Sequence, residues 1–527
     1  MISRRIFMAS SAASLTMLSA PSLLRAESSR VLRYIPVIDL ALLDPVASTA
    51  QVSRTHGFLV FDTLYGMDTK QQIHPQMVDR HIVSDDALQW DLVLRDGLMW
   101  HDGEKVTARD CVASIQRWSK RDASGQALMA LTDELSAPDD KTIRFRLQKP
   151  FPYIPYVLGK VSSPVCFMMP ERIANTDPFA QITEIIGSGP YRYVAAERLP
   201  GSRNVYQRFE GYKPREDGVA DWTSGPKITH FDRVEWTTMP DAATGTAAMQ
   251  AGEQDWQDTM PHDLLPMVEM FPELRTMVLD DLGFTCAMRV NHLQAPFNNP
   301  DVRRALMAAI DQEAFMTAVA GNNPDYMYTK LGYFTPGTPF ASQGGLEVFE
   351  GPRDYDAVKA ALKAAGYNGE KVVLLVPADS LAQKPLGDIA FDVMQKAGMN
   401  VEYAAMDFAS VLKRRTLKDP VDQGGWSAFV GNWQGIDWLS PLTHNTLRGD
   451  GAFPGWYQGP EMEALRNEWL ATPDEALQVE LAAKMQLQAF HDVPYYPIGQ
   501  YKQPTLFRSD LDGILKGTAV FWNVRRS

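Results

Sequence analysis

The sequence has little cysteine, with three residues in 527 and no C-x-x-C pair. Zinc-ribbon, thioredoxin-like and iron–sulfur sites need closely spaced cysteines, so the sequence excludes them. The nine histidines form no H-E-x-x-H or other short metal-ligand spacing, and we expect no metal and no cofactor. Three is an odd number, so at least one thiol stays unpaired. We expect Cys111 and Cys286 to be buried thiols.

Basic residues and catalytic motifs are also scarce. Lys and Arg total 51 against 64 Asp and Glu, which gives a formal net charge of −13. A nucleic-acid binder needs a basic surface to replace phosphate counterions, so no nucleic-acid partner is expected. The chain has no G-x-S-x-G elbow and no G-x-x-x-x-G-K-[ST] loop, and the glycines of Gly187 to Tyr191 fit a turn. The sequence gives no positive sign of an enzyme.

No run of about 20 apolar residues is present at the N-terminus, where a membrane anchor would need one. Arg4 and Arg5 precede an uncharged stretch from Met8 to Leu24, a layout that resembles a twin-arginine export signal. We expect cleavage after Ala26, with a transmembrane anchor as the alternative. No cysteine lies nearby for lipid attachment, which predicts a soluble periplasmic product. Removing residues 1–26 takes away three arginines and no acid, so the mature charge is −16.

The length predicts more than one lobe, since domains run to roughly 100–200 residues. Strand-like runs at 371–376 and 400–403 flank a helix expected over 385–397, a β-α-β unit with parallel strands. The N-terminal half instead shows many short strands separated by turns. Together these patterns predict two differently built α/β lobes. Further helices are expected from Thr107 onward, from Asn299 to a stop at Gly321, and over 354–365 and 473–490.

A long motif from Trp100 to Arg117 resembles the F-H-D-G-x-x-h-T-A-x-D-V-x-x-S-x-x-R signature of extracellular solute-binding proteins of the dipeptide/oligopeptide family, family 5. Other landmarks of that family follow in the expected order. The resemblance covers about residues 30–527. The further landmarks are Leu43 to Pro45, Phe61 to Leu64, Gly187 to Arg192, Ala248 to Asp255, Pro296 to Asp311, and Asp492 to Pro494.

The resemblance implies the type II periplasmic-binding-protein fold of the large peptide-binding class, an α/β architecture of two lobes with an extra subdomain in the first. It places the first lobe at 27–280 plus 491–527, with an inserted subdomain at about 54–186, and the second lobe at 281–490. Chain crossings near 280–285 and 491–500 would form the hinge on which the lobes close.

The function implied is capture of a peptide or peptide-like, possibly cationic, solute for an ABC importer. The partners are then the ligand and inner-membrane permease subunits, and the receptor is expected to be a monomer without catalysis. The same fold could instead bind a sugar, an opine, a nickel-chelate or another small metabolite. An exported hydrolase is a remote alternative from a different class.

Site residues also follow from the resemblance. Relatives pair the main chain of an extended ligand by strand addition, which places first-lobe contacts near Thr49 and Gln51. In the second lobe Asp437 is the candidate partner for a ligand ammonium group, since a charge-assisted hydrogen bond is about twice as strong as a neutral one. Trp433 matches the family's tryptophan, and the spacing from Trp433 to Asp437 is one residue longer than in oligopeptide binders. The remaining expected contacts are Asn432, Trp433, Gln434 and Trp438.

Aromatic residues crowd the same part of the sequence. They fit a stacking or cation–π wall for the ligand, or ordinary packing of core and lobes. The sequence leaves both open for Trp426, Trp433, Trp438, Trp456 and Tyr457.

Overall fold

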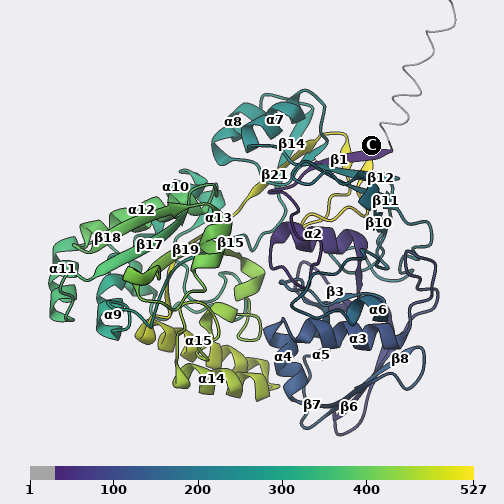
Figure 1. Cartoon of the computed structure of the whole chain (residues 1–527), viewed down its shortest axis with the longest axis horizontal. Helices are drawn as coiled ribbons and strands as arrows, with labels where there is room; N and C mark the ends of the chain where they lie inside the picture. The colour runs from purple at the N-terminus through teal and green to yellow at the C-terminus, as the bar shows by residue number, and fades with distance from the viewer. Residues whose placement is uncertain (1–29) are drawn as a thin grey trace, which may run out of the picture.

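The structure is a computed structural model that describes residues 30–527. The expected export signal at 1–26 lies outside the described residues. Figure 1 shows two lobes side by side, one built around strands β15 to β20 and the other around β1 and β10 to β14, with a further subdomain below the latter. The two-lobed α/β fold expected from the sequence is confirmed. No helix within 30–527 combines the length and the apolar character that a membrane crossing requires.

The first lobe contains a seven-stranded sheet in the order β10-β11-β12-β1-β13-β21-β14. β1 pairs in parallel with β12 and β13, and the other pairs are antiparallel. Aromatic rings fill the space beside it, with Tyr34 lying 4.9 Å from Phe521 and 5.4 Å from Trp256 between ring centres. The strands are β1 Val31–Ile35, β10 Tyr191–Tyr193, β11 Arg203–Arg208, β12 Arg233–Thr237, β13 Trp256–Gln257, β14 Leu274–Val278 and β21 Pro504–Arg508.

The subdomain has its own antiparallel sheet in the order β5-β6-β8-β7. Buried and less buried residues alternate along β6 and β8, because successive side chains point to opposite faces and only one face is covered. The helix start predicted at Thr107 is confirmed. The elements are β5 Val78–Val83, β6 Gln89–Leu94, β7 Thr132–Ser136, β8 Thr142–Leu147, α3 Ala108–Ser119, α4 Ala123–Ala130 and α5 Ile154–Gly159. Helix α2, Gln51–Val60, precedes them.

The second lobe contains a six-stranded sheet in the order β16-β20-β15-β19-β17-β18. Its β17-α12-β18 unit confirms the predicted β-α-β motif, with all residues of β17 paired in parallel to β18. The strands are β15 Phe284–Val290, β16 Met327–Tyr328, β17 Lys371–Pro377, β18 Asn400–Met406, β19 Ala428–Gln434 and β20 Tyr495–Tyr501. The main helices are α9 Pro300–Met307, α10 Gln312–Ala320, α11 Tyr355–Ala364, α12 Gln383–Lys396, α13 Phe408–Arg414, α14 Pro460–Ala471 and α15 Glu475–Asp492.

The prediction of one helix from Asn299 to Gly321 is wrong, because the chain forms two. Asn299 caps α9 by accepting from the backbone N–H of Asp301, as expected. The second helix begins after Asp311, whose carboxylate accepts from two backbone N–H groups of the next turn. A side chain that satisfies free N–H groups favours a new helix start over continuation of the old one.

The chain passes between the lobes twice. The first crossing joins β14, which pairs in the first-lobe sheet, to β15 of the second-lobe sheet. The second lies at Lys502 and Gln503, because β20 pairs with β15 in the second lobe while β21 pairs with β13 and β14 in the first. We therefore move the boundary expected at 491 to the residues after Tyr501.

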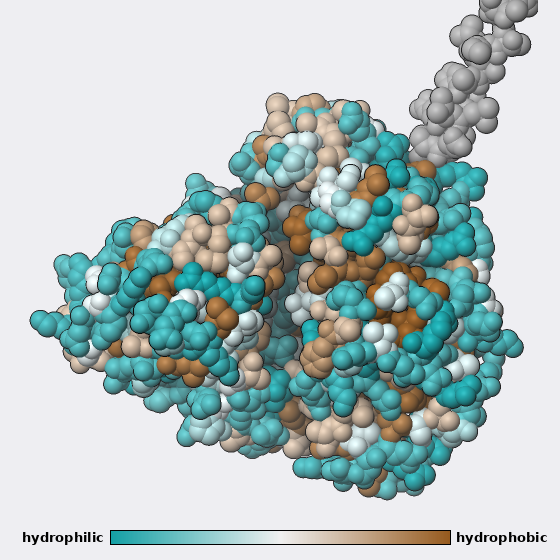
Figure 2. Space-filling view, viewed as in Figure 1, coloured by the Kyte–Doolittle hydropathy of each residue, from teal (hydrophilic) through white to brown (hydrophobic). Residues whose placement is uncertain are grey.

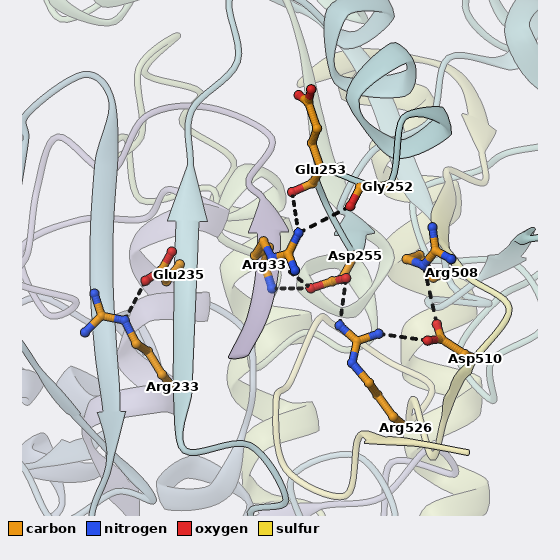
Figure 3. Close-up of polar contacts among 9 residues, drawn as sticks. All are labelled: Arg33, Arg233, Glu235, Gly252, Glu253, Asp255, Arg508, Asp510 and Arg526. Atoms are coloured by element: carbon orange, nitrogen blue, oxygen red, sulfur yellow. Dashed lines mark hydrogen bonds and ion pairs between the residues drawn. The ribbon is translucent and has the colours of Figure 1, made fainter. Parts of the chain in front are cut away.

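Asp255, the last residue of one family landmark, ties the returning chain to the first lobe (Figure 3). Its side chain is buried and accepts from the backbone N–H of Arg33 at 2.9 Å and from Nη2 of Arg526 at 2.8 Å. The second guanidinium nitrogen of Arg526 donates to Asp510 at 2.9 Å. One buried carboxylate thus links β1, the start of β13 and the C-terminal residues.

Asp44 and Arg117, from two other landmarks, form a buried ion pair that joins the start of the first lobe to α3. Nη2 of Arg117 lies 2.6 Å from Oδ2 of Asp44, and Nη1 donates to the other carboxylate oxygen at 3.2 Å. Asp44 also accepts from the backbone N–H groups of Val46 and Ile182. Two parallel hydrogen bonds between a guanidinium and a carboxylate fix both position and angle.

We predict that Asp44→Ala lowers the free energy of unfolding by about 3–5 kcal/mol, because it leaves the buried Arg117 charge without its partner. Urea unfolding of the purified protein measures the change. Asp79→Ala, which breaks an exposed pair with Arg80, is the matched control and should move the midpoint little. Equal midpoints for Asp44→Ala and Asp79→Ala would contradict the role given to the buried pair.

Candidate ligand-binding cleft

A hollow runs between the two lobes in the space-filling view (Figure 2). In the second lobe its wall comes from the end of β19 and the short 3-10 helix Gly435–Trp438 that follows. The backbone N–H of Gly435 donates to the carbonyl of Gly283 at 2.7 Å, which ties this segment to the first crossing. Residues after β19 therefore face the hinge and the first lobe at the same time.

Asp437 lies on this 3-10 helix and is half-buried. Burial raises the pKa of its carboxyl to about 6, while the positive charges of Arg54 and Lys160 in the first lobe act in the opposite direction. A carboxylate that feels charges on the other lobe must stand at the interface of the two. The segment chosen from the sequence as the cation-binding wall thus does face the first lobe.

Two further carboxyl groups belong to the same neighbourhood, of which Asp258 is buried and Asp280 is half-buried. Asp258 follows β13 and accepts from Nε2 of Gln51 at 3.3 Å, and burial raises its pKa to about 6. Asp280 lies on the first crossing, and burial raises its pKa to about 7. Its Oδ1 accepts from the backbone N–H of Leu282 at 3.0 Å, while Oδ2 is buried with no hydrogen-bond partner in the described part of the chain.

Arg54 of α2 is a cation on which the charges of all three carboxylates act. Its side chain is buried, with 3% of the residue exposed. Burial lowers the pKa of the guanidinium, and the charges of Asp437, Asp280 and Asp258 raise it. Nη1 donates to the carbonyl of Val161 at 3.1 Å, but Nε and Nη2 have no hydrogen-bond partner within residues 30–527.

Lys160, the other cation near Asp437, already has its partners. Its Nζ lies 2.9 Å from Oδ2 of Asp122 and donates to the carbonyls of Ser162 and Pro164 at 2.7 and 3.0 Å. The ammonium is therefore fully engaged in holding the loop after α5. Arg54 is left as the cleft cation with free donors.

The residues expected to bind ligand occupy different environments. Thr49 is exposed just before α2, and Gln51 is the first residue of that helix rather than part of an extended strand. Gln434 is buried with its Oε1 unpartnered in the described chain. Asn432 is bound within the second lobe, accepting from Gln383 at 2.8 Å and donating to Tyr501 at 2.9 Å.

The aromatic residues divide between wall and core. Trp433 is half-buried and stands over Trp438, with ring centres 5.8 Å apart. Trp438 is 1% exposed and stacks on His444 on its other side at 4.8 Å, so it supports Trp433 from within the lobe. Trp426, Trp456 and Tyr457 are also buried in the second-lobe core. Trp433 is thus the one of these five aromatic residues that keeps partial exposure.

Sequence reasoning missed Arg54, Asp258 and Asp280. One signal was present, since Arg54 is the only Asp, Glu, Lys or Arg between Pro45 and Phe61. A single charge in an otherwise uncharged stretch is a signal for a buried functional residue. Asp258 and Asp280 carry no comparable mark, because each becomes part of the cleft only through the folding of the first lobe.

The lobes also touch at the end of their interface away from β21, where α5 meets α14 and α15 (Figure 1). The ring of Tyr153 stacks on that of Trp469, with centres 5.7 Å apart, and its hydroxyl donates to the carbonyl of Thr472 at 2.9 Å. This contact joins first-lobe and second-lobe residues across the mouth of the cleft. It contributes only when the lobes are close together.

The cysteines are Cys111, Cys166 and Cys286, all buried and free of disulfides, so the expected burial of Cys111 and Cys286 is confirmed. Within 30–527, no three side chains among His, Cys, Asp and Glu are grouped so that one metal ion could bind them.

This fold and this cleft define a two-lobed solute-binding protein. Residues 72–452 match the family "Bacterial extracellular solute-binding proteins, family 5 Middle". The chain belongs to the family 5 extracellular solute-binding proteins, as the motif from Trp100 to Arg117 indicated.

Individual relatives agree with this assignment. The chain is 36% identical over 535 residues, covering all of both chains, to the probable peptide ABC transporter periplasmic-binding protein of Sinorhizobium fredii. Among solved structures it is similar to the Helicobacter pylori periplasmic binding protein DppA in complex with the peptide STSA, with a TM-score of 0.79, 20% identity, and 95% of this chain and 99% of that chain covered. The agropinic acid complex of AgaA from A. tumefaciens R10 gives a TM-score of 0.77 and 20% identity, with 94% and 99% covered.

The raised pKa of Asp280 makes a prediction for stability. The unfolded carboxyl titrates near 3.8 and the folded one near 7, so the folded state loses stability as pH rises between these values. Asp280→Asn removes that penalty. We expect the ligand-free variant to be more stable than the wild type by on the order of 1–4 kcal/mol at about pH 8, with the difference shrinking toward about pH 4. Thermal or urea unfolding across this pH range tests it, and a difference independent of pH would contradict the assignment.

A second prediction concerns the contact across the mouth of the cleft. Tyr153→Ala removes the stack on Trp469 and the hydrogen bond to Thr472, so we expect a larger open population and a faster ligand off-rate. Small-angle scattering and stopped-flow fluorescence measure the two. Tyr153→Phe keeps the ring and should fall between wild type and Ala, whereas unchanged scattering in Tyr153→Ala would show that the contact does not hold the lobes together.

Proposed function

We propose that this chain is the soluble periplasmic receptor of an ABC importer, and that it captures a peptide or peptide-like solute with a cationic group between its lobes. The supporting observation is the set of three carboxyl groups, Asp258, Asp280 and Asp437, whose pKa values are raised by withdrawal from water and whose charges all act on Arg54. Acidic groups withdrawn from water gain most from a cationic ligand, because the ligand restores the interactions that burial removed.

The names of the relatives support the same class of ligand. The Sinorhizobium fredii relative is named for peptide transport, and one structural neighbour holds the peptide STSA. The neighbour with agropinic acid keeps a non-peptide metabolite open as the alternative in the same cleft. Delivery to inner-membrane permease subunits and action as a monomer without catalysis complete the proposal.

Export and lobe motion are part of the proposal. Residues 1–26 would direct secretion as a twin-arginine-type signal, with no lipid anchor on the product. The first lobe would comprise 27–280 and 503–527, with the subdomain inserted at about 54–186, and the second lobe 281–502. Hinge closure at the two crossings would bring Thr49, Gln51 and Arg54 toward Trp433, Gln434 and Asp437.

The test uses purified residues 27–527. Mass spectrometry of material released on denaturing the freshly purified protein identifies a co-purified ligand. Calorimetry with defined di- and tripeptides, nickel with histidine, and agropinic acid then measures binding. We expect saturable binding of one ligand per chain and an unchanged ligand afterwards. Steady formation of hydrolysis products would favour the exported hydrolase instead.

Asp437 has its own test. Asp437→Asn keeps the shape and removes the charge, so the affinity for the best-binding cationic ligand should fall at least about tenfold, as expected for a hydrogen bond to a charged group. Asp422→Asn changes an exposed carboxylate in the same lobe and should leave the affinity unchanged. Full affinity in Asp437→Asn would remove the proposed cation contact.

A further inference from the structure

The second crossing is held at a single residue by both lobes. The backbone N–H of Lys502 donates at 2.8 Å to the carbonyl of Tyr326, which lies in the second lobe just before β16. The carbonyl of Lys502 accepts at 2.9 Å from Nε2 of His262 in the first lobe. A carbonyl cannot donate, so this imidazole nitrogen carries the hydrogen. The two backbone groups of Lys502 are therefore fixed to different lobes.

Further contacts confine the chain on both sides of Lys502. Before it, Tyr501 ends β20 in the second-lobe sheet. After it, the side-chain amide of Gln503 donates to the carbonyl of Met260 at 2.6 Å, and the N–H of Met260 donates to the carbonyl of Pro504 at 2.8 Å. Because the peptide unit is planar, only the φ and ψ of Lys502 separate the bond to the second lobe from the bond to the first. A rotation of the lobes can pass through these two dihedrals with both hydrogen bonds intact.

The rings of His262 and Tyr326 also contact each other, edge to face, with centres 5.1 Å apart. Tyr326 packs against the second-lobe core and also against the first-lobe cluster that contains Met260 and Leu265. Burial raises the pKa of its hydroxyl, and the charge of Glu269 from the first lobe adds to the shift. Groups near a rotation axis move little, so this ring pair can persist while the contact of α5 at the far end of the interface opens.

The first crossing is less tightly held. On its first-lobe side the N–H of Gly517 donates to the carbonyl of Leu279 at 2.7 Å, and on its second-lobe side the amide of Gln500 donates to the carbonyl of Leu282. Three residues, 280–282, carry the free dihedrals between these two bonds. The second crossing has one such residue, so it restricts the direction of lobe rotation more than the first crossing does.

We propose that His262 and Tyr326 make Lys502 the pivot of lobe closure at the second crossing, and that His262 keeps the rotation on one path. This pivot deepens the proposed function and rests on the lobe motion described there. If the carbonyl of Lys502 lost its donor, the bend could spread into the residues that follow, because an unbound backbone group no longer fixes its peptide. The lobes would then open in several directions. His262 acts here as a positioning residue of the hinge.

The test measures distances between the lobes by pulsed electron paramagnetic resonance on purified residues 27–527. Spin labels on Asp133→Cys and Lys359→Cys, both exposed and on different lobes, report the distance, since the native cysteines are buried. We expect a narrow distribution without ligand and another with the best-binding peptide of the panel. His262→Ala should widen both at least about twofold, because the carbonyl of Lys502 loses its donor. His230→Ala, an exposed change in the first lobe, is the control and should leave the widths unchanged.

Two pairs of variants separate the hydrogen bond from the ring and the pivot from its neighbours. His262→Gln keeps a donor and should stay near the wild-type width, whereas His262→Phe keeps a ring without a donor and should widen the distribution. Lys502→Gly keeps both backbone bonds but frees the dihedrals, so it should widen the distribution, while Lys502→Ala should match the wild type. Equal widths in Lys502→Gly and Lys502→Ala would place the bend elsewhere and overturn the proposal, as would an unchanged width in folded His262→Ala.

Thermal unfolding checks that the variants fold, and the Lys502 pair decides the question if the His262 variants do not fold. The ligand-free widths test the pivot even when no ligand of the panel binds. If a bound ligand leaves the wild-type distance unchanged, the lobe closure in the proposed function fails instead.

Discussion

The position of β21 is the constraint on which the two-lobed arrangement depends. This strand lies between β13 and β14, so β14 reaches the rest of the first sheet only through a strand from the C-terminal end of the chain. The sheet is complete only after the second lobe has been laid down. Both lobes are thereby joined by two adjacent crossings, which permits a hinge rotation and resists twisting or separation.

The family landmarks serve this architecture more than they serve ligand recognition. Asp44 and Arg117 hold the subdomain to the first lobe, and Asp255 holds the returning C-terminus. A sequence signature built from such residues identifies the fold with little ambiguity. The signature carries no information on which solute binds, because that specificity depends on side chains brought together from both lobes.

Local patterns predicted the local structure well. Strand-like runs on either side of an expected helix located β17, α12 and β18, and the helix start expected at Thr107 located α3. The break between α9 and α10 was missed because Asp311, read as one residue of an amphipathic run, caps a new helix. The boundary at 491 was placed too early, since strand pairing rather than composition decides which lobe β20 joins.

The ligand contacts expected in both lobes remain predictions. Asp437 and Trp433 face the cleft, while Asn432 and Trp438 are held by contacts within their own lobe. Arg54, Asp258 and Asp280 come from segments far apart in the sequence. Their proximity is a product of tertiary structure, and helix or strand periodicity cannot predict it.

The carboxyl groups that the cleft withdraws from water lower the stability of the ligand-free protein. Each keeps a proton more readily than it would in water, which means that the empty receptor is held in a state less favourable than its sequence could reach. Neutral replacements would raise the stability of the protein and, under the proposed function, lower its affinity for a cationic ligand. Selection for heat tolerance alone would therefore favour neutral residues in place of Asp258 and Asp280.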